Sequence, residues 1–554
     1  MISHAAVRQT TIAALGLACT LAVGPAAFAR GGRQDSGDGV DALFSRWTTS
    51  TPGCAIGVSE NGRIVLEKAY GMADLEHEVP NRPDTIFEAG SVSKQFTAAA
   101  VLLLARDGKL SLDDPVRKYI PELPDYGTPI TIRQVLQHTS GLRDWGNVED
   151  IAGWPRGTRV YTHAHVLDIL GRQGRLNFMP GTRWSYSNSG YNLAAIVVSR
   201  VSGDSFAEFS RKRIFEPLGM SRSSWRDDYT RIVKGRAVAY AALPGGYHAD
   251  MPFENIHGNG GLLTTVGDLL RWNENFDAPK VGDAAFVKLM QTPGRLSDGK
   301  TFDYAFGLGI GSYKGLREVR HSGTTASYRA FLARYPDRHV SIAILCNAGD
   351  STPRETLHQV TDLYLADAIS IEPAPESVPV AVADLDALAG MYRNIERGDL
   401  LNIEHEGTTL RFEGEAPLMA QSSRRYSDGD GTSIEFDGKG GATIDDGSGA
   451  PIRLERAAAA HPTVTELAAL AGTYSSDEAE TTFTLRVQDG VLEAMQRPDK
   501  VYRLTPLYPD AFGSGLGTII LRRDGEGDVN EFSVVQDRVW DLRFRRQVSE
   551  QCTG

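Results

Sequence analysis

The chain has 554 residues, of which 41% are hydrophobic and 23% are charged, and its formal net charge is −12. This length exceeds one ordinary domain, and the composition is that of a soluble globular protein. The negative balance offers no basic footprint for nucleic acid or for an anionic membrane surface, so we expect neither as a partner.

The first 29 residues are typical of a secretory signal peptide. His4 and Arg8 precede an apolar run over residues 11–26, and the letters AFA at 27–29 form a small-residue cleavage signal. We therefore expect an exported protein, periplasmic or secreted from a bacterium. No later stretch is long enough to span a bilayer, so no transmembrane anchor is expected after cleavage.

Four cysteines are present, at positions 19, 54, 346 and 552, and cleavage removes the first. Cys54 and Cys346 lie in strand-like runs, so a disulfide between them is possible in an oxidising compartment, but we interpret them as two small buried residues. No Cys or His pattern has the spacing of a metal site, and we expect no metal or cofactor. His163 and His165 are interpreted as a surface pair at the start of a helix.

Strand-like runs occur at both ends of the next region. Residues 53–60 and 63–71 are joined by Asn61-Gly62, which predicts a tight hairpin. Helical and irregular segments fill 87–275, and strand-like runs return over 306–347 before a last helix at 354–370. This order predicts an α+β fold in which one sheet takes its strands from both ends of the region.

The C-terminal third contains a repeat. A Pro-rich linker at 371–383 is followed by LDALAGMY at 385–392, and LAALAGTY at 467–474 repeats this pattern. Each copy precedes short strands of alternating polarity with Gly and Asp turns. The repeat predicts two small antiparallel β-barrel domains, at 384–458 and 464–548.

A buried helix begins beside a serine and a lysine. Residues 96–104 are almost wholly apolar and predict a helix that ends at Asp107-Gly108. Lys94 at the start of this helix is costly unless something uses it, and Ser91 lies three residues earlier on the same helical face. The free N–H groups of the helix start stabilise an oxyanion and disfavour an ammonium, so Lys94 is expected to take a proton from Ser91.

Two further motifs carry polar groups. Tyr186 and Asn188 offer a phenol for proton relay and an amide for a substrate carbonyl on one turn. His321 and Gly323 begin a strand, where glycine permits close approach of a substrate and the N–H of Thr324 is a possible oxyanion donor. Each of the three patterns recurs once elsewhere, and there we interpret it as structural. Ser-x-x-Lys recurs at 297–300, Tyr-x-Asn at 392–394 and His-x-Gly at 405–407.

In this order, Ser-x-x-Lys, Tyr-x-Asn and His-x-Gly resemble the motifs of the serine β-lactamase and penicillin-binding-protein superfamily. The branch that they resemble best is the class C β-lactamase-related serine hydrolases, peptidase family S12. Further similar stretches lie at 131–145, 213–220 and 258–272. The resemblance implies a hydrolase domain at 38–370, with an antiparallel sheet flanked by helices, a mostly helical lobe and the site between them.

The resemblance also implies roles for the motif residues. Ser91 is the acyl-accepting nucleophile, Lys94 its proton partner, Tyr186 the general base or relay, and Asn188 a contact to the substrate amide. The implied reaction is two-step acyl transfer, with an acyl-enzyme on Ser91 that water then hydrolyses.

At the third motif, His321 replaces the lysine of class C β-lactamases, and Gly323 follows it. The oxyanion hole is expected from the backbone N–H groups of Ser91 and Thr324. His138 is also similar to a family position, and we interpret it as structural, near the chemistry but outside it. We interpret Asp268 likewise as a helix N-terminal residue.

The function implied is an S12-type peptidase or amidase on short peptides, possibly with a D-residue. Histidine at the third motif occurs in D,D-peptidases and D-aminopeptidases, and it lowers our expectation of efficient β-lactam hydrolysis. A carboxylesterase is the alternative, and a non-catalytic penicillin- or peptidoglycan-binding module is less favoured because all the motif residues are present.

The two predicted barrels resemble the domain plan of the superfamily's D-aminopeptidases, in which a barrel loop reaches the site. Candidate loops here are residues 422–433 and 508–517. Whether either loop reaches the site, and what the oligomeric state is, the sequence leaves open. The expected partner is a small peptide, amide or ester substrate.

Overall fold

The computed structural model describes residues 34–370, 377–407, 409–415, 417–429 and 431–547. The predicted signal peptide and the first part of the predicted linker lie outside these residues. We call residues 34–370 the N-terminal part. Within the described ranges, no helix combines the length and the apolar character that crossing a bilayer requires.

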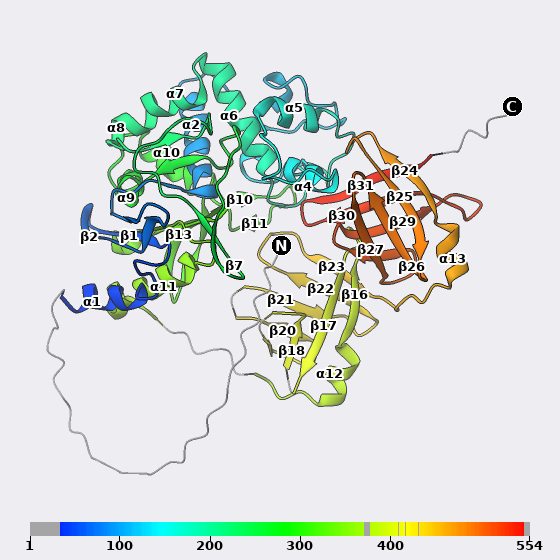
Figure 1. The fold of residues 1–554 in the computed structure, drawn as a ribbon. Helices are drawn as coiled ribbons and strands as arrows, with labels where there is room; N and C mark the ends of the chain where they lie inside the picture. The colour runs from blue at the N-terminus through cyan, green and yellow to red at the C-terminus, as the bar shows by residue number, and fades with distance from the viewer. Residues whose placement is uncertain (1–33, 371–376, 408, 416, 430, 548–554) are drawn as a thin grey trace, which may run out of the picture.

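The N-terminal part is built on a six-stranded antiparallel sheet in the order β12-β13-β14-β15-β1-β2 (Figure 1). The predicted hairpin supplies β1 and β2, and its turn has the left-handed backbone at Asn61 and Gly62 that such turns require. The prediction of one sheet with strands from both ends is therefore confirmed. The strands are β1 (Cys54–Glu60), β2 (Arg63–Tyr70), β12 (Gly309–Tyr313), β13 (Leu316–Thr325), β14 (Tyr328–Tyr335) and β15 (Val340–Cys346).

A disulfide joins two adjacent strands of this sheet, β15 and β1. Cys54 on β1 lies directly opposite Cys346 on β15, and their sulfur atoms are bonded. Our interpretation of both as unpaired residues is therefore wrong. The two runs were recognisable as strands, but the register that places the cysteines opposite one another is not written in either run.

Helices cover both faces of the sheet. One face packs on α1 (Gln34–Leu43) and α11 (Pro353–Tyr364), with Val40 and Leu357 fully buried between them and the strands. The other face packs on α9 and on the turn that leads into the buried α2, beyond which a helical lobe extends (Figure 1). The helices on this side are α2 (Lys94–Arg106), α3 (Ile132–Leu136), α4 (Trp145–Ile151), α5 (His163–Gly171), α6 (Asn188–Ser202), α7 (Phe206–Ser210), α8 (Glu216–Leu218), α9 (Val266–Glu274) and α10 (Ala284–Met290).

Short strands brace the loops around these helices. Small sheets pair β3 with β4, β7 with β8, β10 with β11, and β5 with β9 and β6. They are β3 (Met72–Asp74), β4 (Val79–Pro80), β5 (Phe87–Glu88), β6 (Ser224–Trp225), β7 (Tyr240–Leu243), β8 (Gly246–Ala249), β9 (Leu262–Thr264), β10 (Gly294–Arg295) and β11 (Thr301–Phe302).

Two local predictions on this side have clear outcomes. Helix α5 begins at His163 as expected, and His163 and His165 are both partly exposed. The His163 Nε2 lies 3.0 Å from the backbone oxygen of His257, and the two rings are 4.3 Å apart. Asp268 lies in the first turn of α9, as expected, and its backbone N–H donates to the capping hydroxyl of Thr265.

Two closed eight-stranded barrels follow, as the repeat predicts, and each is preceded by a short helix, α12 (Val382–Leu388) or α13 (Val464–Ala469). Barrel 1 consists of β16 (Gly390–Asn394), β17 (Leu400–Glu406), β18 (Thr409–Phe412), β19 (Pro417–Ala420), β20 (Arg425–Ser427), β21 (Ser433–Phe436), β22 (Gly441–Asp445) and β23 (Ile452–Arg456). Barrel 2 consists of β24 (Gly472–Ser476), β25 (Thr481–Gln488), β26 (Val491–Gln496), β27 (Lys500–Pro506), β28 (Ala511–Ser514), β29 (Gly517–Arg523), β30 (Val529–Gln536) and β31 (Val539–Arg546).

The repeated octapeptide joins the short helix to the first strand of each barrel. In barrel 1 the buried Tyr392 donates from its hydroxyl to the backbone oxygen of Leu388 at 2.8 Å. In barrel 2 the buried Tyr474 donates in the same way to Leu470 at 3.0 Å. The preceding helix is therefore tied to the first strand by the same hydrogen bond in both copies, which accounts for the repeated Tyr.

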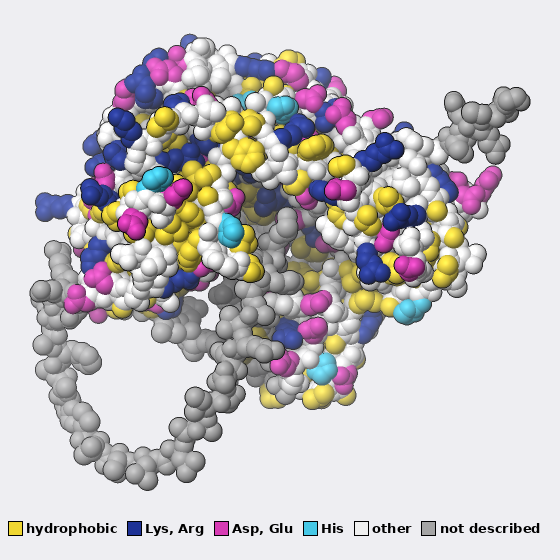
Figure 2. Space-filling model, viewed as in Figure 1, with side chains coloured by type: hydrophobic (Ala, Val, Ile, Leu, Met, Phe, Trp, Pro, Cys, Tyr) yellow, Lys and Arg dark blue, Asp and Glu magenta, His cyan; other side chains and the backbone are white. Residues whose placement is uncertain are grey.

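Barrel 2 docks on the helical lobe, beside α4 and α5, and barrel 1 lies next to it (Figure 1). Gln496 of barrel 2 donates to the backbone oxygen of Ile151 at 2.9 Å, and the buried Arg143 forms an ion pair with Glu478 at 3.0 Å. Figure 2 shows Lys and Arg interspersed with Asp and Glu over the viewed face.

Candidate active site

Ser91 lies in a tight turn at the start of the buried helix. The 3-10 turn Gly90–Ser93 leads directly into α2, and Ser91 is half-buried while its neighbours on both sides are buried. Gly90 has a φ of 51°, and a Cβ at this position would lie 2.5 Å from the backbone nitrogen of Thr324. Only glycine therefore fits between this turn and the strand beside it.

Lys94 is fully buried directly behind Ser91. Its Nζ lies 3.0 Å from Ser91 Oγ, and it donates to Asn188 Oδ1 at 2.9 Å and to the backbone oxygen of Asn259 at 2.7 Å. The predicted serine and lysine thus lie within hydrogen-bond distance, and the amide of the second motif joins them. Asn259 was not singled out as a site residue, because a backbone acceptor leaves no mark on the side-chain pattern.

The surroundings of Lys94 favour its neutral form. Burial lowers the pKa of Lys94 well below its usual value, and the positive charge of Arg538 lowers it further. The carboxylate of Asp144 acts in the opposite direction, and Arg156 adds to the lowering. A neutral amine beside a serine hydroxyl is able to accept its proton.

Tyr186 and Asn188 are held at the start of α6. Asn188 donates from its backbone nitrogen to Asp144 Oδ2 at 2.6 Å, and the Tyr186 ring centroid lies 4.7 Å from Lys94 Nζ. Burial raises the pKa of the Tyr186 phenol, whereas its hydrogen bond with Ser91 and the charge of Arg538 lower it. The structure therefore brings the first and second motifs into one cluster.

The third motif lies on β13, which packs against the Ser91 turn. A Cβ at Gly323 would lie 2.0 Å from the backbone oxygen of Ala89 and 3.2 Å from the nitrogen of Ser91. Together with Gly90, this glycine lets the strand approach until the backbones of Ser91 and Thr324 are neighbours. That is the arrangement that two backbone donors need in order to bind one oxyanion.

His321 is 92% buried beside this approach. Its Nδ1 lies 2.6 Å from the backbone oxygen of Ser322, so Nδ1 carries the proton and Nε2 accepts from the Tyr304 hydroxyl at 3.0 Å. Burial lowers the pKa of His321 to about 3, and Lys94 contributes to this lowering. The histidine therefore supplies no positive charge at neutral pH, in contrast to a lysine.

Aromatic rings surround Tyr186. The His138 ring centroid lies 4.3 Å from that of Tyr186, and His138 Nδ1 accepts from the backbone nitrogen of Ser187 at 3.1 Å. Tyr304 also packs on His138, with ring centroids 4.8 Å apart, and lies edge-on to Tyr186. His138 thus holds the Tyr186 turn by a backbone contact, and Tyr304, which no motif indicated, orients His321.

The turn between β30 and β31 of barrel 2 reaches Tyr186. The Arg538 guanidinium carbon lies 4.9 Å from the centroid of the Tyr186 ring, and the backbone oxygen of Arg538 accepts from the nitrogen of Asp144 at 3.2 Å. This turn lies outside both loops that the sequence offered as candidates. A barrel segment therefore reaches the site, but it is a segment that the sequence did not indicate.

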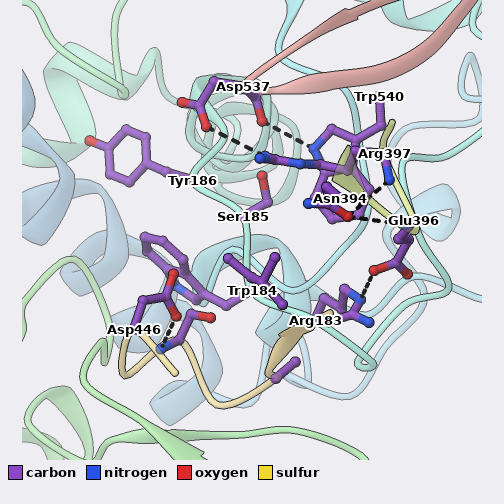
Figure 3. Close-up of a pocket in the computed structure, with 13 residues that line it drawn as sticks. Arg183, Trp184, Ser185, Tyr186, Asn394, Glu396, Arg397, Asp446, Asp537 and Trp540 are labelled. Atoms are coloured by element: carbon purple, nitrogen blue, oxygen red, sulfur yellow. Dashed lines mark hydrogen bonds and ion pairs between the residues drawn. The ribbon is translucent and has the colours of Figure 1, made fainter. Parts of the chain in front are cut away.

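A cavity of about 150 Å³ opens beside Tyr186 where the three parts of the molecule meet (Figure 3). The N-terminal part contributes Trp184 and Tyr186 to its lining, barrel 1 contributes Arg397, and barrel 2 contributes Asp537 and Trp540. An ion pair of 2.5 Å between Arg183 and Glu396 joins barrel 1 to this wall.

The second Ser-x-x-Lys pattern, at 297–300, forms the turn of the β10–β11 hairpin. Ser297 donates to the backbone oxygen of Gly181 at 2.7 Å, and Lys300 is exposed. This pattern is not assembled as a serine–lysine pair. Across the part of the chain that the structure describes, no cluster of three or more His, Cys, Asp or Glu side chains could hold a metal ion.

The arrangement of sheet, lobe and three motifs agrees with the comparison with known families, in which the Beta-lactamase family matches residues 40–366. The chain belongs to the β-lactamase family. It is therefore a serine hydrolase, and the predicted fold class, a β-lactamase-like part followed by two barrels, is confirmed.

Relatives in this family differ in how much of the chain they match. Penicillin-binding protein 4* of Bacillus subtilis is 30% identical over 54% of this chain and 68% of its own length. A D-aminopeptidase of Cereibacter sphaeroides is 26% identical over 83% of this chain and 87% of its own length. An octameric penicillin-binding protein homologue from Pyrococcus abyssi shares the fold, with a TM-score of 0.54 and 22% identity over 84% of this chain and 99% of that one.

Proposed function

We propose that this β-lactamase-family protein is an exported serine peptidase or amidase that forms an acyl-enzyme on Ser91. The observation that carries the proposal is the fully buried Lys94, whose Nζ lies 3.0 Å from Ser91 Oγ. Burial lowers the pKa of Lys94, so the amine is able to act as a base toward the serine at neutral pH.

In the acylation step, Ser91 Oγ forms a bond to the substrate carbonyl carbon while its proton passes to Lys94, directly or through the Tyr186 phenol. The oxyanion that develops is bound by the backbone N–H groups of Ser91 and Thr324. The intermediate then collapses, the C–N bond breaks, and the same proton goes to the leaving amine. Asn188 has its amide nitrogen free of the Lys94 contact, and this nitrogen donates to the substrate amide.

In the deacylation step, water adds to the ester carbonyl on Ser91. Lys94 and Tyr186 accept the proton of this water, and the proton returns to Ser91 Oγ when the acyl C–O bond breaks. His321 remains neutral throughout and, with Gly323, forms the wall along which the substrate backbone lies.

Short substrates with a D-residue are favoured by two observations. Relatives that match most of the chain are named D-aminopeptidases. The Asp537–Arg538 turn and the small cavity beside Tyr186 restrict the space on one side of the site. Export is supported by the signal-like residues 1–29 and by the Cys54–Cys346 disulfide, because disulfides persist in oxidising compartments.

An ester is a second substrate class for the same site, because its leaving group departs without needing the proton that an amine requires. β-Lactam hydrolysis is expected to be weak, since the neutral His321 stands where class C enzymes carry a lysine. Parallel assays with a D-alanine amide, a p-nitrophenyl ester and benzylpenicillin separate these outcomes.

The test is the Ser91→Ala variant, assayed for turnover and for covalent labelling by a fluorophosphonate. We expect turnover to fall by about 10⁴-fold or more and the single adduct seen by intact-protein mass to disappear, with the fold unchanged. Ser297→Ala is the matched control, because it removes the serine of the second Ser-x-x-Lys pattern, and it is expected to retain full activity. Undiminished turnover in Ser91→Ala would sink the proposal.

A further inference from the structure

The turn of barrel 2 is fixed to the active site through its backbone. The oxygen of Arg538 accepts from the nitrogen of Asp144 at 3.2 Å and from Asn177 Nδ2 at 2.9 Å. On the other side of the turn, the nitrogen of Trp540 donates to Asn177 Oδ1 at 3.0 Å. These bonds use no atom of the Arg538 side chain, so the turn keeps its place when that side chain is changed.

A short series of hydrogen bonds continues from this turn to the nucleophile. Asp144, which holds the turn with its backbone nitrogen, accepts from the backbone nitrogen of Asn188 at 2.6 Å. Asn188 Oδ1 then accepts from Lys94 Nζ, and Lys94 contacts Ser91. A continuous series of hydrogen bonds therefore connects barrel 2 to the cluster around Ser91.

The Arg538 side chain faces the same cluster. Its guanidinium carbon lies 4.9 Å from the centroid of the Tyr186 ring, which is within the range of a cation–π contact. Its nearest carboxylate is that of Asp537, at 3.5 Å from Nε, and the Asp537 side chain is 61% exposed to solvent. A solvated neighbour of this kind neutralises little of the charge that Arg538 directs at the ring.

Other ionisable groups face Tyr186 and Lys94 from each element packed against them. They are His138 from the loop after α3, Asp144 at the start of α4, Arg156 from the loop after α4, Tyr191 on α6, Tyr304 from the segment before β12, and His321 on β13. Lys94 itself lies on α2, beside the Tyr186 ring. Burial lowers the pKa of both histidines, which therefore stay neutral, and Arg156 is paired with Glu254.

We propose that Arg538 of barrel 2 is a positioning residue that keeps the Tyr186–Lys94 pair in its proton-accepting form. A permanent cation over the ring stabilises a phenolate and destabilises a nearby ammonium, so both members of the pair lose a proton more readily. The active site of the N-terminal part thus takes part of its charge from the second barrel. This inference rests on the proposed function, because it concerns the base that activates Ser91.

The direction of the electrostatic effect is the same for both groups. The charge of Arg538 lowers the pKa of Lys94 and also lowers the pKa of Tyr186. The expected shift of the pH profile therefore does not depend on which of the two accepts the serine proton.

The test compares kcat/KM for a D-alanine amide or a p-nitrophenyl ester, whichever the full-length protein turns over, as a function of pH. In Arg538→Gln the acidic limb is expected to move to higher pH by about one unit, so that kcat/KM below the limb falls about tenfold. Arg538→Lys keeps the charge and is expected to restore most of the wild-type profile. Arg538→Glu reverses the charge and is expected to move the limb further in the same direction.

Arg393→Gln is the matched control. Arg393 lies in barrel 1 with its guanidinium carbon 5.5 Å from the centroid of the Tyr508 ring, so it makes a similar contact outside the active-site cluster. Its removal is expected to leave the acidic limb in place. Thermal unfolding of each variant checks that the fold is intact.

Two results would overturn the inference while leaving the proposed function intact. One is an unmoved limb in Arg538→Gln and in Arg538→Glu. The other is a uniform loss of activity at every pH, which would mean that Arg538 only shapes the site. Full turnover in Ser91→Ala would instead overturn the proposed function itself, so the two failures are distinguishable.

Discussion

The two barrels share a repeated octapeptide and a topology, but the turn between their last two strands makes different contacts in each. In barrel 1 the last two strands, β22 and β23, are joined by residues 446–451, and in barrel 2 the last two strands, β30 and β31, are joined by residues 537–538. Both turns face the N-terminal part. In barrel 1, Gly449 lies against Leu296 and Pro451 accepts from Arg183 at 3.3 Å. In barrel 2, the shorter turn places Arg538 on Tyr186.

The cores of the two barrels also differ in how closely they join the N-terminal part. The interior of barrel 1 forms a separate hydrophobic cluster, whereas the interior of barrel 2 is continuous with the core of the N-terminal part. A closed barrel that shares a core with its neighbour can hold a turn at a fixed distance from a catalytic group. One scaffold, present twice, thus contacts Arg183 in one copy and places an arginine over Tyr186 in the other.

The largest effect is expected from breaking the link between barrel 2 and Asn188. Asp144→Ala removes a helix cap on Gly146 and the acceptor of the Asn188 backbone. We expect kcat/KM to fall about a hundredfold, because a small displacement of the Tyr186–Asn188 turn disturbs the base. The free energy of unfolding, measured by urea titration, is expected to fall by about 2 kcal/mol.

Asp283→Ala is the control for this prediction, because Asp283 caps α10 by accepting from the nitrogen of Phe286 at 3.0 Å. Its loss is expected to cost about 1 kcal/mol of stability and no activity. Equal activity losses in the two variants would mean that Asp144 acts only as a cap and that the link to barrel 2 has no catalytic consequence.

A smaller effect is expected on the pH dependence of stability, through His321 in the N-terminal part. His321 has a folded-state pKa of about 3, below the value of about 6.5 expected when unfolded. Its contribution to stability is therefore fully present above pH 6.5 or so and is lost as the pH falls toward the folded-state value, because only the unfolded chain takes up the proton. Between pH 6.5 and pH 5 or so, we expect the free energy of unfolding to fall by about 2 kcal/mol from this residue.

Urea titrations at several pH values check this expectation, with His321→Gln as the variant that lacks the titrating group. The variant is expected to lose less stability than the wild type over the same pH interval. Parallel curves for the two proteins would show that the histidine is not held neutral by its surroundings.

The smallest effect tests whether the barrels are equivalent apart from their turns. Tyr392→Phe and Tyr474→Phe each remove one hydroxyl that donates to the preceding helix. We expect each to lower the free energy of unfolding by about 1 kcal/mol, as is usual for such a bond, and to leave kcat/KM unchanged. A loss of activity confined to Tyr474→Phe would show that barrel 2 transmits changes of its far end to the site.

The features that the sequence predicted depend on residues close together in the chain. The β1–β2 hairpin has its own turn signal, the barrels have a repeated octapeptide, and Lys94 stands out because a buried charge near Ser91 needs a reason. Each of these is visible within a short window of sequence.

The features that the sequence did not predict join residues that are far apart. The Cys54–Cys346 pair depends on strand register, and the contact of Arg538 with Tyr186 depends on how barrel 2 docks. Asn259 contacts Lys94, and Asp144 contacts barrel 2, through backbone atoms, which any residue possesses. Strand register, the docking of a barrel and contacts of backbone atoms leave no local pattern in the sequence, so they could not be predicted from it.

The most direct measurement is the rate at which a fluorophosphonate labels Ser91 as a function of pH, in the wild type and in Arg538→Gln. It requires no knowledge of the substrate and reports the activation of Ser91 alone. We expect one adduct in each protein, with the acidic limb of the labelling rate about one pH unit higher in the variant. Superimposable profiles would contradict the claim that barrel 2 contributes charge to the active site.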